Sequence, residues 1–134
     1  MFPKNLIFHL RKKLSNKKIA ITGSNGFIAS HVVKIISENN LTNKKIVLLN
    51  RKNTDYSLTS LKKKLNSVDF IIHLSSATGG IGYTSNFPAS QFYTALKKDI
   101  NVFEASKDKK IKRLISLANL HVYSKKINGQ LKKE

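Results

Sequence analysis

Residues 19–33 hold the side chains and glycines whose spacing best suits a chemical task. Their sequence is IAITGSNGFIASHVV, with Gly23 and Gly26 followed by Ala29. Gly23 can take backbone angles that a side chain forbids, Gly26 lets a ligand approach the main chain, and Ala29 permits close packing of a helix on a strand. No acidic residue lies between Gly23 and Ser37. Free N–H groups at the start of the following helix therefore predict a pyrophosphate site.

A second set of candidate residues follows the next apolar run. In a dinucleotide site an acidic residue at this place holds the ribose 2′-hydroxyl, whereas an arginine suits a 2′-phosphate. This sequence has Asn50 and Arg51 there, which favours NADP over NAD. The alternative is that Arg51 is one more solvated base in a basic protein. No Gly-Lys-Ser/Thr follows the glycines, which excludes a Walker-type mononucleotide loop.

The elements that would position these residues alternate between short apolar runs and stretches with helical spacing. Runs at residues 18–22, 45–50, 70–74 and 113–118 predict strands, and the stretches whose apolar spacing begins at 27, 58 and 92 predict helices. Asp55 or Ser57 would cap the second helix, and a Gly-rich and Ser-rich loop is expected at 75–86. This pattern predicts an α/β fold: a partial Rossmann-type parallel sheet of about four strands, in the order 3-2-1-4, with flanking helices.

The pattern also divides the chain. Residues 1–16 form a basic N-terminal arm with apolar side chains on one helical face, which we expect to lean on its own domain rather than on a membrane or a partner. Residues 17–125 form an incomplete NAD(P)-binding Rossmann domain. Residues 126–134 form a polar basic tail.

The composition limits the function classes. The chain has 134 residues, 25 Lys plus Arg against 7 Asp plus Glu, a net charge of +18 and 40 % hydrophobic residues, which together allow one small folded domain. The lysines are scattered without interleaved aromatics, so nucleic-acid binding is only a second alternative, which predicts salt-sensitive retention on DNA. The absence of cysteine excludes Cys-ligated metal sites and indicates a reducing, cytoplasmic compartment. No apolar run is long enough for a membrane span, and no metal site is predicted.

Four segments carry a resemblance to a known family: TGSNGFIAS, DFIIHLSSATGGIG, NFPASQFYTALKKDINVFEAS and KRLISLANLHVYS. In this order and spacing they resemble the extended short-chain dehydrogenases, the NAD-dependent epimerase/dehydratases of nucleotide sugars, and within them the GDP-L-fucose synthase branch. The resemblance covers residues 17–125 and only the N-terminal part of a family member. It implies that the pyrophosphate contacts Gly23, Ser24, Asn25, Gly26, Phe27 and Ile28. It also implies that the adenosine phosphate contacts Arg51. The ribose and nicotinamide side would contact Ser75, Ser76 and Ala77.

The catalytic positions of the family do not match. Its chemistry relies on a serine just after the fourth strand and a downstream Tyr-x-x-x-Lys pair. This sequence has Asn119 at the serine position and His121 where fucose synthases have a cysteine, and no Tyr-x-x-x-Lys follows. Tyr93 and Lys97 have that spacing but precede the fourth strand, on a helix explained by an apolar stripe packed on the sheet (Phe92, Leu96, Ile100 and Phe103).

The resemblance thus implies a nucleotide-sugar epimerase, dehydratase or reductase whose coenzyme domain is present and whose catalytic half is missing, so that activity stays open. We expect a truncated chain that binds NADP, or alternatively NAD. The alternative is a non-catalytic dinucleotide-sensing or interaction module, completed by a partner chain or a second copy through the exposed edge of its sheet.

Overall fold

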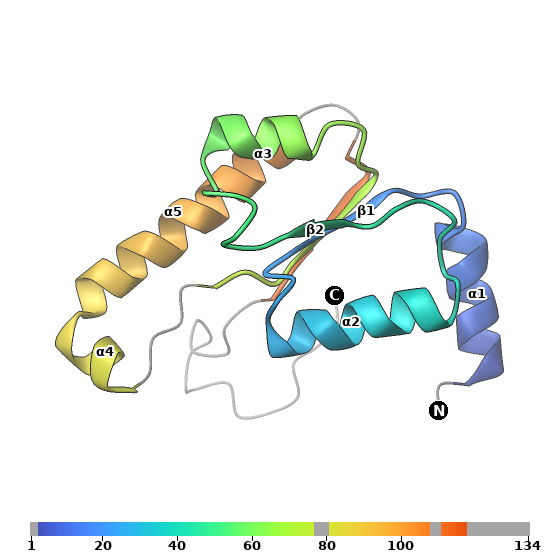
Figure 1. Ribbon diagram of the computed structural model, residues 1–134, viewed down its shortest axis with the longest axis horizontal. Helices are drawn as coiled ribbons and strands as arrows, with labels where there is room; N and C mark the ends of the chain where they lie inside the picture. Colours follow the sequence, from blue (N-terminus) through green and yellow to red (C-terminus); the bar gives the residue numbers. More distant parts are fainter. Residues whose placement is uncertain (1–2, 77–80, 108–110, 118–134) are drawn as a thin grey trace, which may run out of the picture.

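The computed structural model describes residues 3–76, 81–107 and 111–117. Helices and strands occur where the sequence pattern predicts them, and one short helix, α4, lies inside the predicted loop at 75–86. In chain order the elements are α1 (Lys4–Leu14), β1 (Ile19–Thr22), α2 (Phe27–Glu38), β2 (Val47–Leu49), α3 (Leu58–Lys64), β3 (Phe70–His73), α4 (Ile81–Asn86), α5 (Pro88–Ser106) and β4 (Arg113–Ser116) (Figure 1).

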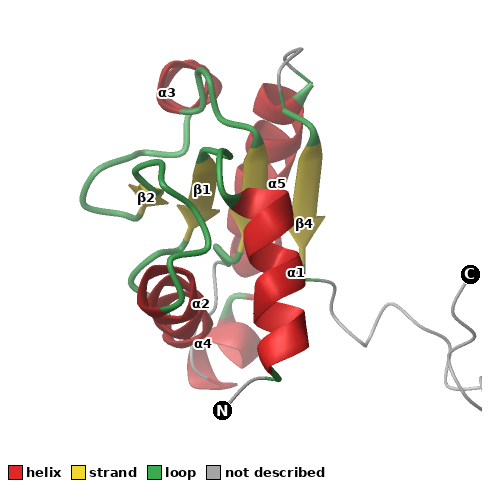
Figure 2. Cartoon of the chain, turned by 90° about the vertical axis from the view of Figure 1, so that its right-hand side faces the viewer, coloured by secondary structure: helices red, strands yellow, loops and turns green. Residues whose placement is uncertain are grey.

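The four strands form one parallel sheet with helices on both faces. The strand order is β2-β1-β3-β4 (Figure 2). Ile19 and Ile21 of β1 pack with apolar residues of α1 and α2, whereas Ala20 packs with those of α3 and α5 on the opposite face. The α/β fold and the Rossmann-type sheet are therefore confirmed.

The predicted strand order 3-2-1-4 is wrong, because β3 pairs with β1 and not with β2. That order needs the first two crossover helices on the same face of the sheet. Here α2 and α3 cover opposite faces (Figure 1). Parallel crossovers are right-handed, so a crossover on the other face carries the chain across the sheet in the opposite direction. The chain therefore returns past β1 and places β3 on its other side.

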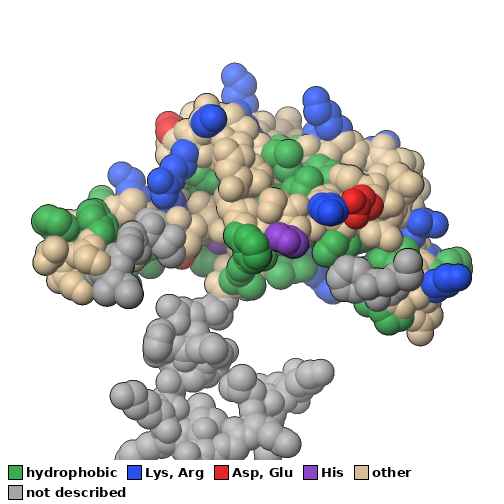
Figure 3. Space-filling model, turned by 60° about the horizontal axis from the view of Figure 1, so that its bottom comes forward, with side chains coloured by type: hydrophobic (Ala, Val, Ile, Leu, Met, Phe, Trp, Pro, Cys, Tyr) green, Lys and Arg blue, Asp and Glu red, His purple; other side chains and the backbone are tan. Residues whose placement is uncertain are grey.

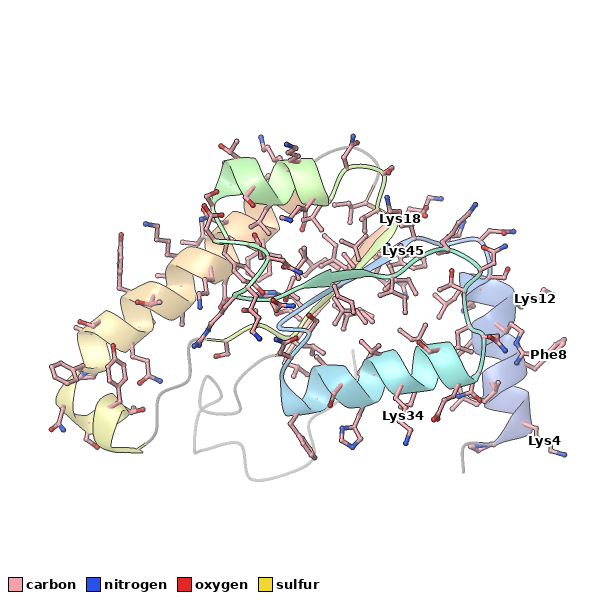
Figure 4. All side chains as sticks on the ribbon, viewed as in Figure 1. Lys4, Phe8, Lys12, Lys18, Lys34 and Lys45 are labelled. Atoms are coloured by element: carbon pink, nitrogen blue, oxygen red, sulfur yellow. The ribbon has the colours of Figure 1, made fainter. Side chains whose placement is uncertain are left out.

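β1 is the centre of the core. All four of its residues are buried, as the β-branched run of a strand covered on both faces predicts. From the N-terminal arm, α1 packs against this core through Ile7, Leu10 and Leu14. Its Arg11 Nη2 donates to the Asn39 carbonyl at the end of α2, at 2.7 Å. α1 therefore leans on its own domain, while Lys4, Phe8 and Lys12 project outward from it (Figure 4).

The apolar stripe of α5 corrects the sequence prediction. The four residues expected to pack on the sheet have exposed side chains, whereas α5 buries Val102 and Ala105 against β1 and β3 residues. Apolar side chains are also exposed in and just after α4, at Tyr83 and Phe87, at the left of Figure 3, and on the edge strand β4, where Ile115 is 52 % exposed. The stripe has helical spacing, but spacing alone does not say which face the rest of the domain covers. The four exposed residues of the α5 stripe are Phe92, Leu96, Ile100 and Phe103.

Asp69 joins the starts of three neighbouring strands. Its carboxylate accepts the Lys18 N–H at 2.9 Å and lies 3.1 Å from Lys112 Nζ, and its carbonyl accepts the Lys112 N–H at 2.7 Å. The Lys18 N–H, and after it the Lys112 ammonium, lowers the pKa of Asp69 below its ordinary value of 3.8. The negative charge of this side chain therefore stabilises the folded state.

We expect Asp69→Asn to lower the free energy of unfolding by about 1 kcal/mol at neutral pH. Because the pKa of Asp69 is lower in the folded state, its contribution is complete above pH 3.8 and is lost as the pH falls through the folded-state pKa. Urea unfolding from pH 7 to pH 3 should therefore show the two proteins converging at acid pH. Glu38→Gln, in an exposed pair with Lys34, is the control and should change little. A difference that stays constant with pH would contradict this assignment.

Candidate functional site

A cavity of about 460 Å³ lies at the carboxyl ends of β1, β2 and β3. After β1 the chain continues into α2, which packs on one face of the sheet. After β3 it continues into α4 and α5, and α5 packs on the other face. This is the point where crossovers diverge, which in open α/β sheets is where ligands bind. The cavity is lined by Gly23, Asn25, Gly26, Asn50, Arg51, Lys52, Tyr56, Leu74, Ser75 and Ser76.

The turn after β1 requires glycine at position 23. Gly23 has φ +66°, and a Cβ there would lie 2.8 Å from the Leu74 carbonyl oxygen. Its carbonyl accepts the Gly26 N–H at 2.8 Å, which closes the turn. Ser24 fastens the turn to β2, because its N–H donates to the Leu49 carbonyl at 3.0 Å and its Oγ accepts from Asn50 Nδ2 at 3.2 Å. Ser24 therefore supports the turn, and its side chain is not part of the lining.

The first turn of α2 opens beside this cavity without a side-chain cap. Gly26 is the N-cap residue, no side chain accepts a hydrogen bond from the first turn, and that turn holds no acidic residue. Ala29 is buried against the sheet, in agreement with its expected packing role. Phe27 and Ile28 are 80 % and 51 % exposed and lie beside the cavity rather than in its lining. The backbone N–H groups of this turn can therefore receive an anion.

The wall after β2 combines a cation with a tyrosine that sequence reasoning missed. Arg51 lines the cavity and makes no ion pair among the described residues. Tyr56 is buried, has φ +58°, and its hydroxyl accepts the Gly23 N–H at 3.0 Å and donates to the Leu49 carbonyl at 3.2 Å. It holds the ends of β1 and β2 together. No local pattern in the sequence indicates this role.

The wall after β3 depends on a buried hydrogen-bond chain. Thr22 Oγ1 lies 2.7 Å from His73 Nδ1 and accepts the N–H groups of Leu74 and Ser75, each at 3.1 Å. His73 Nε2 lies 3.0 Å from Asp99 Oδ1 of α5. These partners assign the tautomer: Nε2 carries the proton and donates it in a hydrogen bond to the Asp99 carboxylate, so Nδ1 accepts from the Thr22 hydroxyl. Both lone pairs of Thr22 Oγ1 then remain for the two backbone N–H groups.

The predicted residues of this wall are partly described. Ser75 and Ser76 line the cavity. Ala77, Asn119 and His121 lie outside the described residues. Tyr93 and Lys97 lie on α5 with the Lys97 ammonium 5.8 Å from the centre of the Tyr93 ring, and neither residue lines the cavity.

The described part of the chain lacks two other features, a metal-binding cluster and a membrane-spanning helix. It contains no group of three or more His, Cys, Asp or Glu side chains placed to hold a metal ion. None of its helices combines the length and the apolar character needed to cross a bilayer.

Comparison with known proteins finds relatives in sequence and in fold. GDP-L-colitose synthase of Yersinia pseudotuberculosis is 26 % identical over 119 residues, which are 85 % of this chain and 37 % of that protein. The structure of a GDP-L-fucose synthetase from Naegleria fowleri bound to NADP matches with a TM-score of 0.70 and 22 % identity, over 88 % of this chain and 38 % of its own. The Bordetella bronchiseptica enzyme WbmF in complex with NAD⁺ matches with a TM-score of 0.61 and 16 % identity, over 81 % of this chain and 40 % of its own.

The chain thus spans 40 % or less of the length of these three relatives. The structural matches support the Rossmann-type fold. The model of the NAD dependent epimerase/dehydratase family matches residues 19–134. This match begins at β1 and includes every residue that lines the cavity, so the chain belongs to the NAD dependent epimerase/dehydratase family.

Proposed function

We propose that the chain binds NADP(H) in the cavity at the ends of β1, β2 and β3. The observation that carries this proposal is the uncapped first turn of α2, which follows the Gly23 turn and opens beside a cavity of about 460 Å³. A pyrophosphate would satisfy its N–H groups and face the positive end of the helix dipole. The cation of Arg51, which has no ion-pair partner in the part of the chain that the structure describes, supports NADP over NAD.

Each wall has its own part in holding the coenzyme. Gly23, Asn25 and Gly26 would hold the pyrophosphate, and Gly26 leaves room for it next to the main chain. Arg51 would bind the adenosine phosphate. Ser75 and Ser76 would lie along the ribose and nicotinamide side, where the Thr22 hydroxyl fixes the backbone. When bound, the nicotinamide ring supplies hydride transfer.

We further propose that a protein containing this domain acts on a nucleotide-linked sugar, as an epimerase, dehydratase or reductase. The resemblance to GDP-sugar enzymes supports this substrate class. The residues after β4 contain no Tyr-x-x-x-Lys, so the proposal assigns the acid–base pair to none of them. The absence of cysteine supports a reducing cytoplasmic location.

The test is titration of the purified protein with NADP(H) and NAD(H) while its unfolding temperature is followed. A ligand that binds only the folded state raises this temperature. We expect a rise with both coenzymes and a larger one with NADP(H). No rise with either, from protein whose circular dichroism shows a folded state, would overturn the proposal. A larger rise with NAD(H) would overturn only the preference based on Arg51.

A second candidate function is that of a dinucleotide-sensing module completed by a partner chain. It is favoured by the exposed apolar side chains on α5 and β4, among them Phe103 at 44 % and Ile115 at 52 % exposure. A partner that adds a strand beside β4 would cover this region. Isolation of a complex whose second polypeptide carries Tyr-x-x-x-Lys would support it. A protein that remains monomeric and stable at high concentration would argue against it.

A further inference from the structure

We propose that Lys98 of α5 is a second cation for the ribose 2′-phosphate and sets the preference for NADP over NAD together with Arg51. This inference rests on the proposed coenzyme site and adds to it a residue more than forty positions away in the sequence. Lys98 is assigned this role by its position over Tyr56, which lines the same cavity as Arg51.

The position of Lys98 is fixed by contacts between α5 and the loop after β2. Lys98 Nζ lies 5.6 Å from the centre of the Tyr56 ring. One helical turn further on, Asn101 Nδ2 donates to the Tyr56 carbonyl at 2.9 Å. The other end of Tyr56 is held by Gly23 and Leu49. The ammonium group thus lies over the ring of a buried residue that lines the cavity, while the half-buried Lys98 is not itself part of that lining.

The charges around Lys98 leave room for an anion. Burial, and after it the positive charge of Arg51, lowers the pKa of Lys98 from its ordinary value, whereas Asp99 raises it. The Asp99 carboxylate is already hydrogen-bonded to His73, and Lys98 has no ion-pair partner among the described residues. The positive charge of Arg51 thus acts on Lys98, neither cation has an ion-pair partner among the described residues, and a phosphate dianion would relieve their repulsion.

This arrangement predicts selectivity and not only affinity. NAD has a hydroxyl where NADP has the 2′-phosphate, so a cation that contacts this phosphate strengthens the binding of NADP alone. A charge-assisted hydrogen bond in a partly exposed site corresponds to roughly a tenfold change in dissociation constant. Lys98 should therefore change the ratio of the two dissociation constants by about this factor.

The experiment compares Lys98→Met with Lys97→Met in the full chain. The neighbouring Lys97 is a matched control, because its ammonium lies at nearly the same distance over a different ring, that of Tyr93, 5.8 Å away. Dissociation constants for NADPH and NADH are measured by coenzyme fluorescence at fixed low salt. We expect Lys98→Met to weaken the binding of NADPH about tenfold and the binding of NADH less than twofold. Lys97→Met should change neither dissociation constant.

Two results would overturn the proposal. One is an unchanged ratio of the two dissociation constants in Lys98→Met, whether or not both coenzymes bind more weakly. The other is the same change of this ratio in Lys97→Met. Lys98→Arg keeps the charge and should retain the preference for NADPH. Loss of this preference in Lys98→Arg would also contradict the proposed role of Lys98. If Lys98→Met does not fold, Lys98→Gln is measured in its place. A wild-type chain that binds neither coenzyme would instead overturn the proposed function.

Discussion

Gly23→Ala is expected to destabilise the folded chain by about 2 to 4 kcal/mol and to abolish coenzyme binding. Gly23 has φ +66°, and the new Cβ would lie 2.8 Å from the Leu74 oxygen and 2.9 Å from the Ser75 Cα. Both are backbone atoms, so no side-chain rotation can relieve the contact. The loop after β3 would have to move away from the end of β1, which is where the cavity lies.

The measurement is the urea midpoint of unfolding, together with the rise in unfolding temperature on adding NADPH. Gly26→Ala is a control within the same turn, because its φ is −77° and its Cβ meets only the Gly23 oxygen, at 3.1 Å. It should lose less than about 1 kcal/mol of stability but weaken coenzyme binding. Gly82→Ala has nothing within 4 Å of the new Cβ and should leave stability unchanged or slightly raised. Gly23→Ala as stable as Gly82→Ala would refute the prediction.

Thr22→Val is expected to lower the free energy of unfolding by about 2 to 3 kcal/mol, although valine has nearly the same shape as threonine. Loss of the hydroxyl leaves three groups without their hydrogen-bond partner: the N–H groups of Leu74 and Ser75 and the Nδ1 atom of His73. Thr22 is fully buried, so water does not replace the hydroxyl without a rearrangement.

The position of the damage can be measured directly. Amide hydrogen exchange of Leu74 and Ser75 should accelerate in Thr22→Val, and NADPH should bind more weakly. Thr22→Ser keeps the hydroxyl and loses only a methyl group, so it should lose about 1 kcal/mol and retain slow exchange at both amides. Equal exchange rates in the valine and serine variants would show that the hydroxyl does not hold this loop.

The elements that the sequence predicted well are those whose signals are local. β1 is a continuous apolar run, which is typical of a strand buried on both faces, and the Gly23 turn follows it directly. Of the two caps proposed for α3, Ser57 is the one whose Oγ accepts a hydrogen bond, from the Ser60 N–H. In each case the pattern that gives the prediction spans only a few neighbouring residues.

The features that the sequence did not predict depend on which face of the sheet each crossover takes. The order of β2, β1 and β3 follows from α2 and α3 lying on opposite faces, and two amphipathic patterns do not contain that choice. The orientation of the α5 stripe was missed for the same reason.

The site shows the same division between local and distant determinants. Gly23, Arg51 and Ser75 follow strands directly and could be placed from the sequence. The contact of Tyr56 with Gly23 and the link from Asp99 through His73 to Thr22 join residues that are 26 to 51 positions apart. Single-sequence patterns carry no record of such pairs.

The central place of β1 has a consequence for how the chain acquires its structure. Thr22 pairs with His73, which is 51 positions later, whereas its neighbour on the other side is Leu49. During synthesis β1 emerges before β3, so one of its edges remains unpaired until β3 has been synthesised. Non-local pairing of this kind slows folding and leaves an adhesive edge during that interval. Chaperone dependence during synthesis, more than heat resistance afterwards, is therefore expected to govern the yield of this protein.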